Sequence, residues 1–193
     1  MTLSRTHRKL TLEEYLTYDD GTDTRYELVD GELVEMPPET RQNNAIAVKL
    51  LLELAKHVPQ HLIAWNAEIE VSGRLANTRC PDLLILTPEA EAALAGTTRA
   101  TLTRDMPPPA LVIEVVSSGV NNRMRDYRHK HTEYAARCIA EYWIVDPQEK
   151  QITVCQWVEG AYDDCLFQGG DRVLSQVVPE FTLTPDQIFG LQT

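Results

Sequence analysis

The sequence predicts a mixed α/β (α+β) fold in which helices flank a central β-sheet. Three apolar runs of strand length, at residues 81–86, 111–116 and 141–146, are short and contain many branched aliphatic side chains. Apolar residues at helical spacing occupy residues 43–58 and 123–137, so predicted helices separate the predicted strands. Strands and helices in this order form a mixed sheet with helices packed against it.

The composition agrees with a single globular domain over residues 1–193. Hydrophobic residues make up 43% and charged residues 24% of the chain, which suits a protein with its own core. No apolar stretch approaches the roughly 20 residues of a membrane span, and residues 1–9 are polar and basic. We therefore expect a cytoplasmic protein. Its four cysteines lack paired spacing, and its formal net charge of −11 argues against tight, non-specific binding to a polyanion.

The amino-terminal region predicts a short helix followed by a hairpin. A Thr-x-x-Glu capping box at residues 11–14 begins a helix that extends to about residue 16. Residues 25–36 alternate in strand fashion around Asp30 and Gly31, a pair that favours positive φ and a tight reversal. This hairpin carries several glutamates, of which Glu27 is a candidate functional residue.

The remaining elements are predicted with fewer signals. Residues 63–71 indicate a strand or a hairpin, and residues 151–167 indicate a hairpin that turns at Glu159-Gly160. Residues 87–105 are polar and rich in alanine, so we expect a short helix in a surface loop that ends at three prolines. A terminal segment covers residues 181–189.

Two carboxylates in or beside apolar strands are the strongest functional signal. Asp82 begins the run at residues 81–86, and Glu114 lies inside the run at residues 111–116. A buried, unpaired carboxylate costs several kcal/mol unless positive charge neutralises it, so two of them suggest a shared cation. Lys130 follows on a predicted helix. Two acids and an amine in this order are typical of metal-dependent phosphodiester hydrolysis.

Several segments together resemble a known family. They are YELVDGELVE at residues 26–35, PDL at 81–83, IEVVS at 113–117, Lys130 with Tyr134, and EYWIVDP at 141–147. In order and spacing they are similar to the Uma family of restriction-endonuclease-like proteins. The resemblance extends over nearly the whole chain, from Leu12 to Phe189, and depends on no single motif.

The resemblance implies the restriction-endonuclease-like fold of the PD-(D/E)XK nuclease superfamily and a site for Mg²⁺ or Mn²⁺. Asp82 and Glu114 match the acids that hold the metal in that superfamily, and Val115 would add its backbone carbonyl. Glu27 resembles an acid that many members contribute from the amino-terminal region. A strict pattern places lysine where this chain has Val116, and Lys130 on the following helix matches the Uma alternative. Asn43 stands near where relatives often carry a histidine.

Structural interpretations compete with each functional one. Asp82 is also typical of a turn at a strand start, Glu114 of a buried ion pair, and Lys130 and Glu27 of solvated charges. The favoured function is a Mg²⁺-dependent endonuclease acting on DNA rather than RNA, with a homodimer expected because two-fold assemblies are the commonest. The alternative is a catalytically inactive nuclease-fold protein with a binding or regulatory role, which Val116 and the acidic surface favour.

Overall fold

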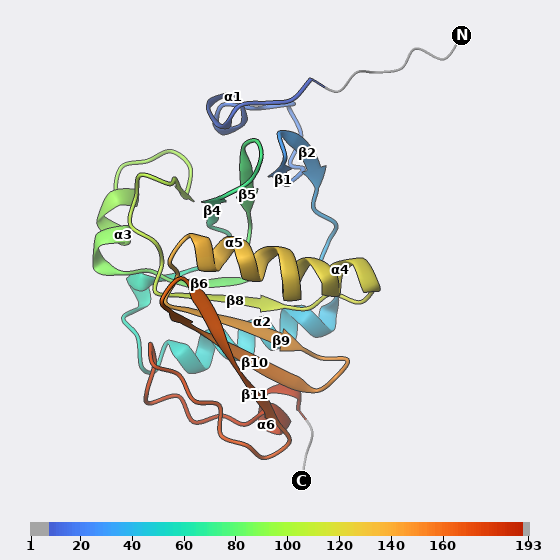
Figure 1. The fold of residues 1–193 in the computed structure, drawn as a ribbon, viewed down its shortest axis with the longest axis vertical. Helices are drawn as coiled ribbons and strands as arrows, with labels where there is room; N and C mark the ends of the chain where they lie inside the picture. Colours follow the sequence, from blue (N-terminus) through green and yellow to red (C-terminus); the bar gives the residue numbers. More distant parts are fainter. Residues whose placement is uncertain (1–7, 191–193) are drawn as a thin grey trace.

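The computed structural model describes residues 8–190, and its centre is a six-stranded mixed sheet (Figure 1). The strand order is β11-β10-β9-β8-β6-β3, with β8 and β9 parallel and the other neighbours antiparallel. The strands are β3 (Ile63–Ala64), β6 (Leu83–Ile85), β8 (Leu111–Val115), β9 (Glu141–Asp146), β10 (Gln151–Val158) and β11 (Ala161–Gln168). The mixed α/β architecture predicted from the sequence is confirmed.

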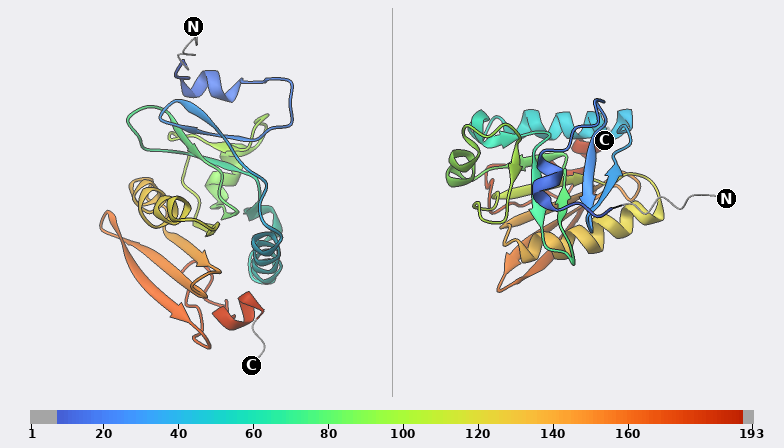
Figure 2. Two further views of the ribbon diagram at one scale, coloured as in Figure 1. Left: turned by 90° about the vertical axis from the view of Figure 1, so that its right-hand side faces the viewer. Right: turned by 90° about the horizontal axis from the view of Figure 1, so that it is seen from above.

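Helices cover both faces of this sheet, as Figure 2 shows from the side. One face is covered by α2 (Arg41–Leu54) together with α6 (Pro185–Phe189). The other face is covered by a continuous helix made of α4 (Val120–Met124), a π-helical turn η2 (Arg125–Lys130) and α5 (His131–Ala136). No helix within residues 8–190 is long and apolar enough to cross a bilayer.

Alternation along the central strands divides the core into two layers. In β8, Leu111, Ile113 and Val115 pack toward α2, whereas Val112 packs toward α5. Side chains of a strand point alternately to its two faces, so Glu114 shares the α5 face with Val112. The strand sequence therefore aims one carboxylate into an otherwise apolar layer.

A separate layer, here called the amino-terminal layer, is built from segments between residues 12 and 102 and lies above the main sheet (Figure 1). It contains α1 (Leu12–Leu16), the hairpin of β1 (Tyr26–Val29) and β2 (Glu32–Glu35), and a three-stranded sheet of β5 (Asn77–Arg79), β4 (Glu68–Val71) and β7 (Thr101–Leu102). The predicted turn is confirmed, because Asp30 and Gly31 have φ of 48° and 77°. The amide of Leu28 donates to Thr78 Oγ1 at 3.0 Å, which attaches the hairpin to β5.

Three details differ from the sequence-based expectations. The segment 87–105 contains the expected short helix, α3 (Pro88–Leu94), but it is more than a surface loop, because it adds β7 to the small sheet, where Leu102 is completely buried. The segment 63–71 is neither one strand nor a hairpin, since β3 and β4 belong to different sheets. The first long helix runs from Arg41 to Leu54 rather than over residues 43–58, because Thr40 caps its amino terminus and a 3-10 turn η1 (Gln60–Leu62) follows.

Residues 1–7 and 191–193 lie outside the described residues, so most of the polar start at residues 1–9 is not described. The four cysteines, all of which are described, are free thiols. Cys80 and Cys155 are buried, and Cys138 and Cys165 are exposed.

Candidate active site

Asp82 and Glu114 meet on the same face of the main sheet. In the antiparallel pair β6–β8, Leu83 lies opposite Ile113, so one further step of this register places Asp82 opposite Glu114. The amide of Val115 donates a hydrogen bond of 2.7 Å to Asp82 Oδ2, which fixes the carboxylate at the start of β6. Glu114 is 5% exposed and Asp82 is half-buried. The two acids that the sequence singled out are therefore neighbours.

Lys130 reaches this carboxylate pair from the helix. Its Nζ lies 2.8 Å from Glu114 Oε1 and 3.3 Å from Asp126 Oδ1, and only 2% of the residue is exposed. Tyr134, one turn further on, donates its hydroxyl to the same Glu114 oxygen at 2.8 Å. Residues four apart share a helix face, so Lys130 and Tyr134 both reach Glu114, and Asp126 lies beside Lys130 on the same face.

Val116 leaves the sheet side of this cluster without positive charge. Val116 lies two residues after Glu114, on the same sheet face, and is 2% exposed within the layer beneath α5. An aliphatic side chain there cannot carry charge. The Lys130 ammonium instead comes from the opposing helix.

Burial and repulsion between the carboxylates disfavour the charged forms of the acids in this cluster. Burial raises the pKa of Asp82 to about 6, and the carboxylates of Glu39 and Asp126 add to this, against the amide of Val115 and the Lys130 ammonium. Burial also raises the pKa of Glu114, and Asp126 and Asp82 contribute in the same direction. Burial alone would lower the pKa of Lys130, but Glu114 and Asp126 outweigh it, so the pKa rises and the amine stays charged.

Glu27 lies near the site but is held by structural partners. Its Oε1 accepts a hydrogen bond of 3.0 Å from the amide of Cys80, and its Oε2 lies 3.5 Å from Arg79 Nη1. Arg79 also donates two bonds of 2.7 Å to Glu133 on α5. Glu27 therefore fixes the segment that leads to Asp82, and it is 6% exposed.

A cleft of about 510 Å³ joins these residues. Its wall includes every sequence-predicted candidate, namely Glu27, Asp82, Glu114, Val115 and Lys130. The cleft opens between the β1–β2 hairpin, the segment that leads into α2, and the end of β8. The sequence candidates thus converge on one cavity.

Glu39 lines the cleft and Asn43 contacts it from the start of α2, and the sequence did not predict the role of either residue. Glu39 accepts hydrogen bonds from Asn43 Nδ2 at 3.0 Å and from Ser117 Oγ at 3.1 Å. Asn43 Nδ2 also lies 3.5 Å from the carbonyl oxygen of Val115. The only available signal was the placement of Asn43 after a proline-rich turn, which marks the segment but not its partners.

The donor atoms of the cleft fit a hard divalent cation. Among the described residues, Lys130 and Tyr134 both use Oε1 of Glu114, which leaves Oε2 for another ligand. Asp82 accepts from Val115 through Oδ2, which leaves Oδ1. With the Val115 carbonyl, these are oxygen donors of the kind Mg²⁺ and Mn²⁺ prefer. The pKa values of both acids are raised because burial disfavours their charged forms, and a bound cation would offset this cost.

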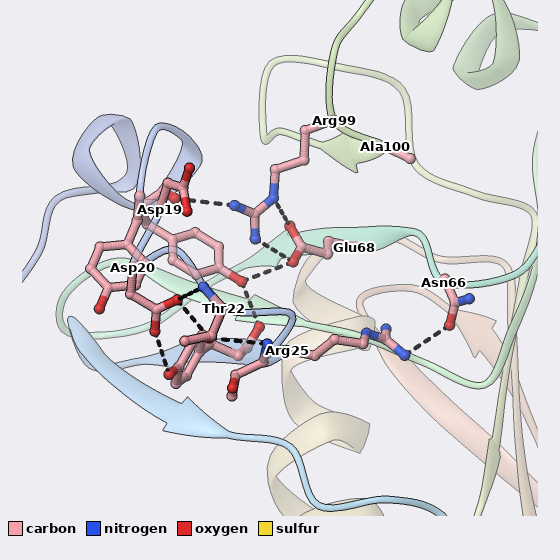
Figure 3. A pocket seen from close by; sticks show the side chains of 12 residues that line it. Asp19, Asp20, Thr22, Arg25, Asn66, Glu68, Arg99 and Ala100 are labelled. Atoms are coloured by element: carbon pink, nitrogen blue, oxygen red, sulfur yellow. Dashed lines mark hydrogen bonds and ion pairs between the residues drawn. The ribbon is translucent and has the colours of Figure 1, made fainter.

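A second pocket, of about 270 Å³, lies between α1, the start of β1 and the β4–β7 edge (Figure 3). Its central acid, Glu68, receives two bonds from Arg99 at 2.9 and 2.6 Å, one from Thr101 at 2.7 Å and one from Tyr15 at 2.8 Å. Burial raises the pKa of Glu68, but the bonds from Arg99, Thr101 and Tyr15 outweigh it and the pKa is lowered. This acid is fully compensated by protein groups.

A separate group of metal-ligating residue types lies outside the cleft. Donor atoms of His131, Cys155 and Asp164 all lie within 4.8 Å of one another, where α5 covers β10 and β11. His131 Nε2 is 3.0 Å from Asp164 Oδ1, so these two already pair with each other. The group shares no residue with the cleft.

The geometry can be compared with known proteins. A family model, Uma2, described as "Putative restriction endonuclease", matches residues 12–186. The chain belongs to the Uma2 family. The resemblance expected from the sequence is therefore confirmed, and the family match includes every residue of the carboxylate cluster.

A solved structure agrees with this family assignment at the level of fold. The crystal structure of "a putative nuclease belonging to DUF820" from Anabaena variabilis superposes with a TM-score of 0.69. It is 16% identical, over 94% of this chain and 98% of that chain, so the likeness shows a shared fold. No curated protein matches the sequence.

Proposed function

We propose that the chain is a Mg²⁺- or Mn²⁺-dependent endonuclease that hydrolyses phosphodiester bonds of nucleic acid, DNA in preference to RNA. The observation that carries this proposal is the pair of neighbouring carboxylates, the half-buried Asp82 and the buried Glu114, with the Lys130 ammonium in contact with Glu114. The Uma2 description and the nuclease fold support the same class of reaction.

Each residue has a role that follows from its contacts. Asp82, Glu114 and the Val115 carbonyl would hold the cation, which when bound supplies a Lewis acid for the phosphate and the attacking water. Lys130 is a fixed, desolvated cation that can donate to the water or to a phosphoryl oxygen, an effect worth a few kcal/mol in comparable sites. Tyr134 and Asp126 orient Glu114 and Lys130. Glu27 assists by fixing the Cys80 amide two residues before Asp82.

Supercoiled plasmid, with a labelled RNA in parallel, tests the reaction in the presence of Mg²⁺ or Mn²⁺. We expect nicking by the wild type and loss of nicking in Asp82→Asn and Glu114→Gln, which keep side-chain size but remove charge. Asp105→Asn is a matched control, because Asp105 is an exposed acid outside the cleft. Equal rates in all four proteins would mean that a contaminant nicks the plasmid. If none of the four proteins nicked the plasmid, the proposal that this chain is an active endonuclease would be wrong.

A second function is favoured by one specific observation. Val116 occupies the position of the usual lysine, and six acids line the cleft: Asp23, Glu27, Glu35, Glu39, Asp82 and Glu114. A nuclease fold that binds or regulates without turnover would keep this arrangement. It predicts that nucleic acid or another partner binds without metal and that Asp82→Asn leaves this binding unchanged.

We also propose a homodimer, because two-fold assemblies are the commonest among soluble oligomers. Sedimentation velocity at micromolar concentration, with and without duplex, measures the assembly. A monomer under both conditions would contradict it.

A further inference from the structure

Trp65 is the most exposed aromatic side chain among residues 8–190. It follows β3 directly, and 70% of it is exposed, whereas Trp143 is fully buried and Trp157 is 36% exposed. Tryptophan carries a large apolar surface that normally packs in a core or an interface. An exposed indole ring therefore points to a ligand that covers it.

Trp65 lies on the wall of the candidate active-site cleft. The same cavity is lined by Asp82, Glu114 and Lys130, and by the apolar side chains of Val34 and Met36 from the β2 end. Val34 is itself 44% exposed. The cleft thus combines a catalytic floor with an apolar, partly aromatic wall.

The backbone and side chains next to Trp65 hold this wall in place. Asn66 has a φ of 62°, a left-handed conformation that asparagine tolerates, and its Oδ1 accepts a bond of 2.8 Å from Arg25 Nη1 (Figure 3). The amide of Glu68, two residues later, bonds to the Ala100 carbonyl at 2.7 Å. A fixed loop presents the ring at little entropic cost.

The charges of the cleft disfavour a ligand held mainly by its phosphates. Six acids line it, against the three cations Arg25, Arg125 and Lys130. Lys130 is buried against Glu114, and Arg125 pairs with Asp126. Duplex DNA is bound largely through phosphate neutralisation, whereas single strands offer base faces that stack on aromatic rings.

We propose that Trp65 is a stacking platform for a nucleobase, and that the cleft takes single-stranded or locally unpaired nucleic acid in preference to intact duplex. The proposal rests on the proposed function, since it names the form of substrate for the same site. One base on the indole ring would place the adjoining phosphodiester inside the cavity that holds Asp82 and Glu114.

Binding without cleavage separates this proposal from the question of turnover. A fluorescently labelled oligodeoxynucleotide and its duplex are titrated with protein in EDTA at one fixed salt concentration, and anisotropy gives the Kd. We expect tighter binding of the single strand, and a loss of about 5- to 150-fold for that strand in Trp65→Ala, the range for one stacked base. Trp65→Phe should recover most of the affinity.

Leu52→Ala is the matched control. Leu52 is 61% exposed on α2 and does not line the cleft, so its removal deletes exposed apolar surface of a different region. Unchanged single-strand affinity in Trp65→Ala, or wild-type binding no tighter for single strand than for duplex, would overturn the proposal. So would a dimer that becomes a monomer in Trp65→Ala, because a second copy would then cover the ring. If the wild-type protein nicked no nucleic acid but still bound the single strand in a Trp65-dependent way, only the proposed function would be overturned.

Discussion

Two of the buried glutamates, Glu68 and Glu114, occupy opposite electrostatic situations. Glu68, in β4 of the small sheet, receives four hydrogen bonds from Arg99, Thr101 and Tyr15, and its pKa is lowered. Figure 3 shows the bonds from Arg99 and Tyr15. Glu114, beneath α5, shares one lysine with Asp126, stands opposite Asp82, and its pKa is raised. Similar burial thus gives a satisfied carboxylate in one place and an unsatisfied one in the other.

The difference separates structural acids from functional ones. A stabilising carboxylate is surrounded by donors that match its charge, and removing it leaves those donors unpaired. A carboxylate kept short of positive charge costs stability and is retained where it binds something. By this criterion the Glu68 pocket holds the amino-terminal layer together, and the Glu114 cleft is the cation site that we propose.

The largest expected effect concerns Lys130, which is the one protein cation in contact with Glu114 among the described residues. Lys130→Met should lower the nicking rate by about 10²- to 10³-fold, the cost of removing one group that stabilises the transition state. Affinity for Mn²⁺ should stay equal or rise, because the change removes a competing positive charge. Single-turnover nicking and calorimetry measure the two quantities. A parallel fall in both would make Lys130 a structural partner of Glu114.

A smaller effect, of opposite kind, is expected at Glu68. Glu68→Gln keeps the shape but leaves Arg99 partly unpaired, so the free energy of unfolding at pH 7 should fall by about 2 to 4 kcal/mol. The loss should shrink below about pH 4, because the lowered pKa of Glu68 makes its contribution disappear as the carboxylate protonates. Urea unfolding measures this. Folded Glu68→Gln protein that nicks as slowly as Asp82→Asn would break the comparison.

The smallest effect is a gain in stability at the cleft. Burial raises the pKa of Asp82 from its ordinary 3.8 to about 6, so between these values the folded protein binds more protons than the unfolded chain. The destabilisation caused by Asp82 therefore develops as pH rises through this window, and it persists at higher pH.

Asp82→Asn should consequently unfold with a free energy about 1 to 3 kcal/mol higher than wild type at pH 8 in EDTA, and equal to wild type near pH 3. Urea titrations at the two pH values provide the measurement. A variant less stable than wild type at pH 8 would show that Asp82 is a satisfied structural acid like Glu68.

Much of the site could be predicted from the sequence because strand burial is visible in it. Asp82 and Glu114 stand out against aliphatic neighbours, and their meeting follows once β6 and β8 are adjacent. The placement of Lys130 came from the family resemblance rather than from spacing. Asp126 could have been found, since it stands four residues before Lys130 on a predicted helix.

Other features depend on contacts between distant segments and leave no local signal. The bonds from Asn43 to the Val115 carbonyl and from Ser117 to Glu39 join α2 and the segment before it to the end of β8. The approach of Trp65 to the cleft likewise brings together segments that are far apart in the sequence. The π-helical turn that ends at Lys130 is likewise set by packing, because its residues have ordinary helical propensity. The buried strand β7 escaped prediction because only two of its residues pair, within a polar segment.

Isothermal titration of Mn²⁺ into wild type, Asp82→Asn and Glu68→Gln is the measurement that tests the central claim most directly. The undercompensated cleft predicts saturable binding to wild type, an affinity lower by at least about tenfold in Asp82→Asn, and wild-type binding in Glu68→Gln, whose acid is already compensated. Equal affinities in wild type and Asp82→Asn, or loss confined to Glu68→Gln, would contradict the assignment of the cation to the cleft of Asp82 and Glu114.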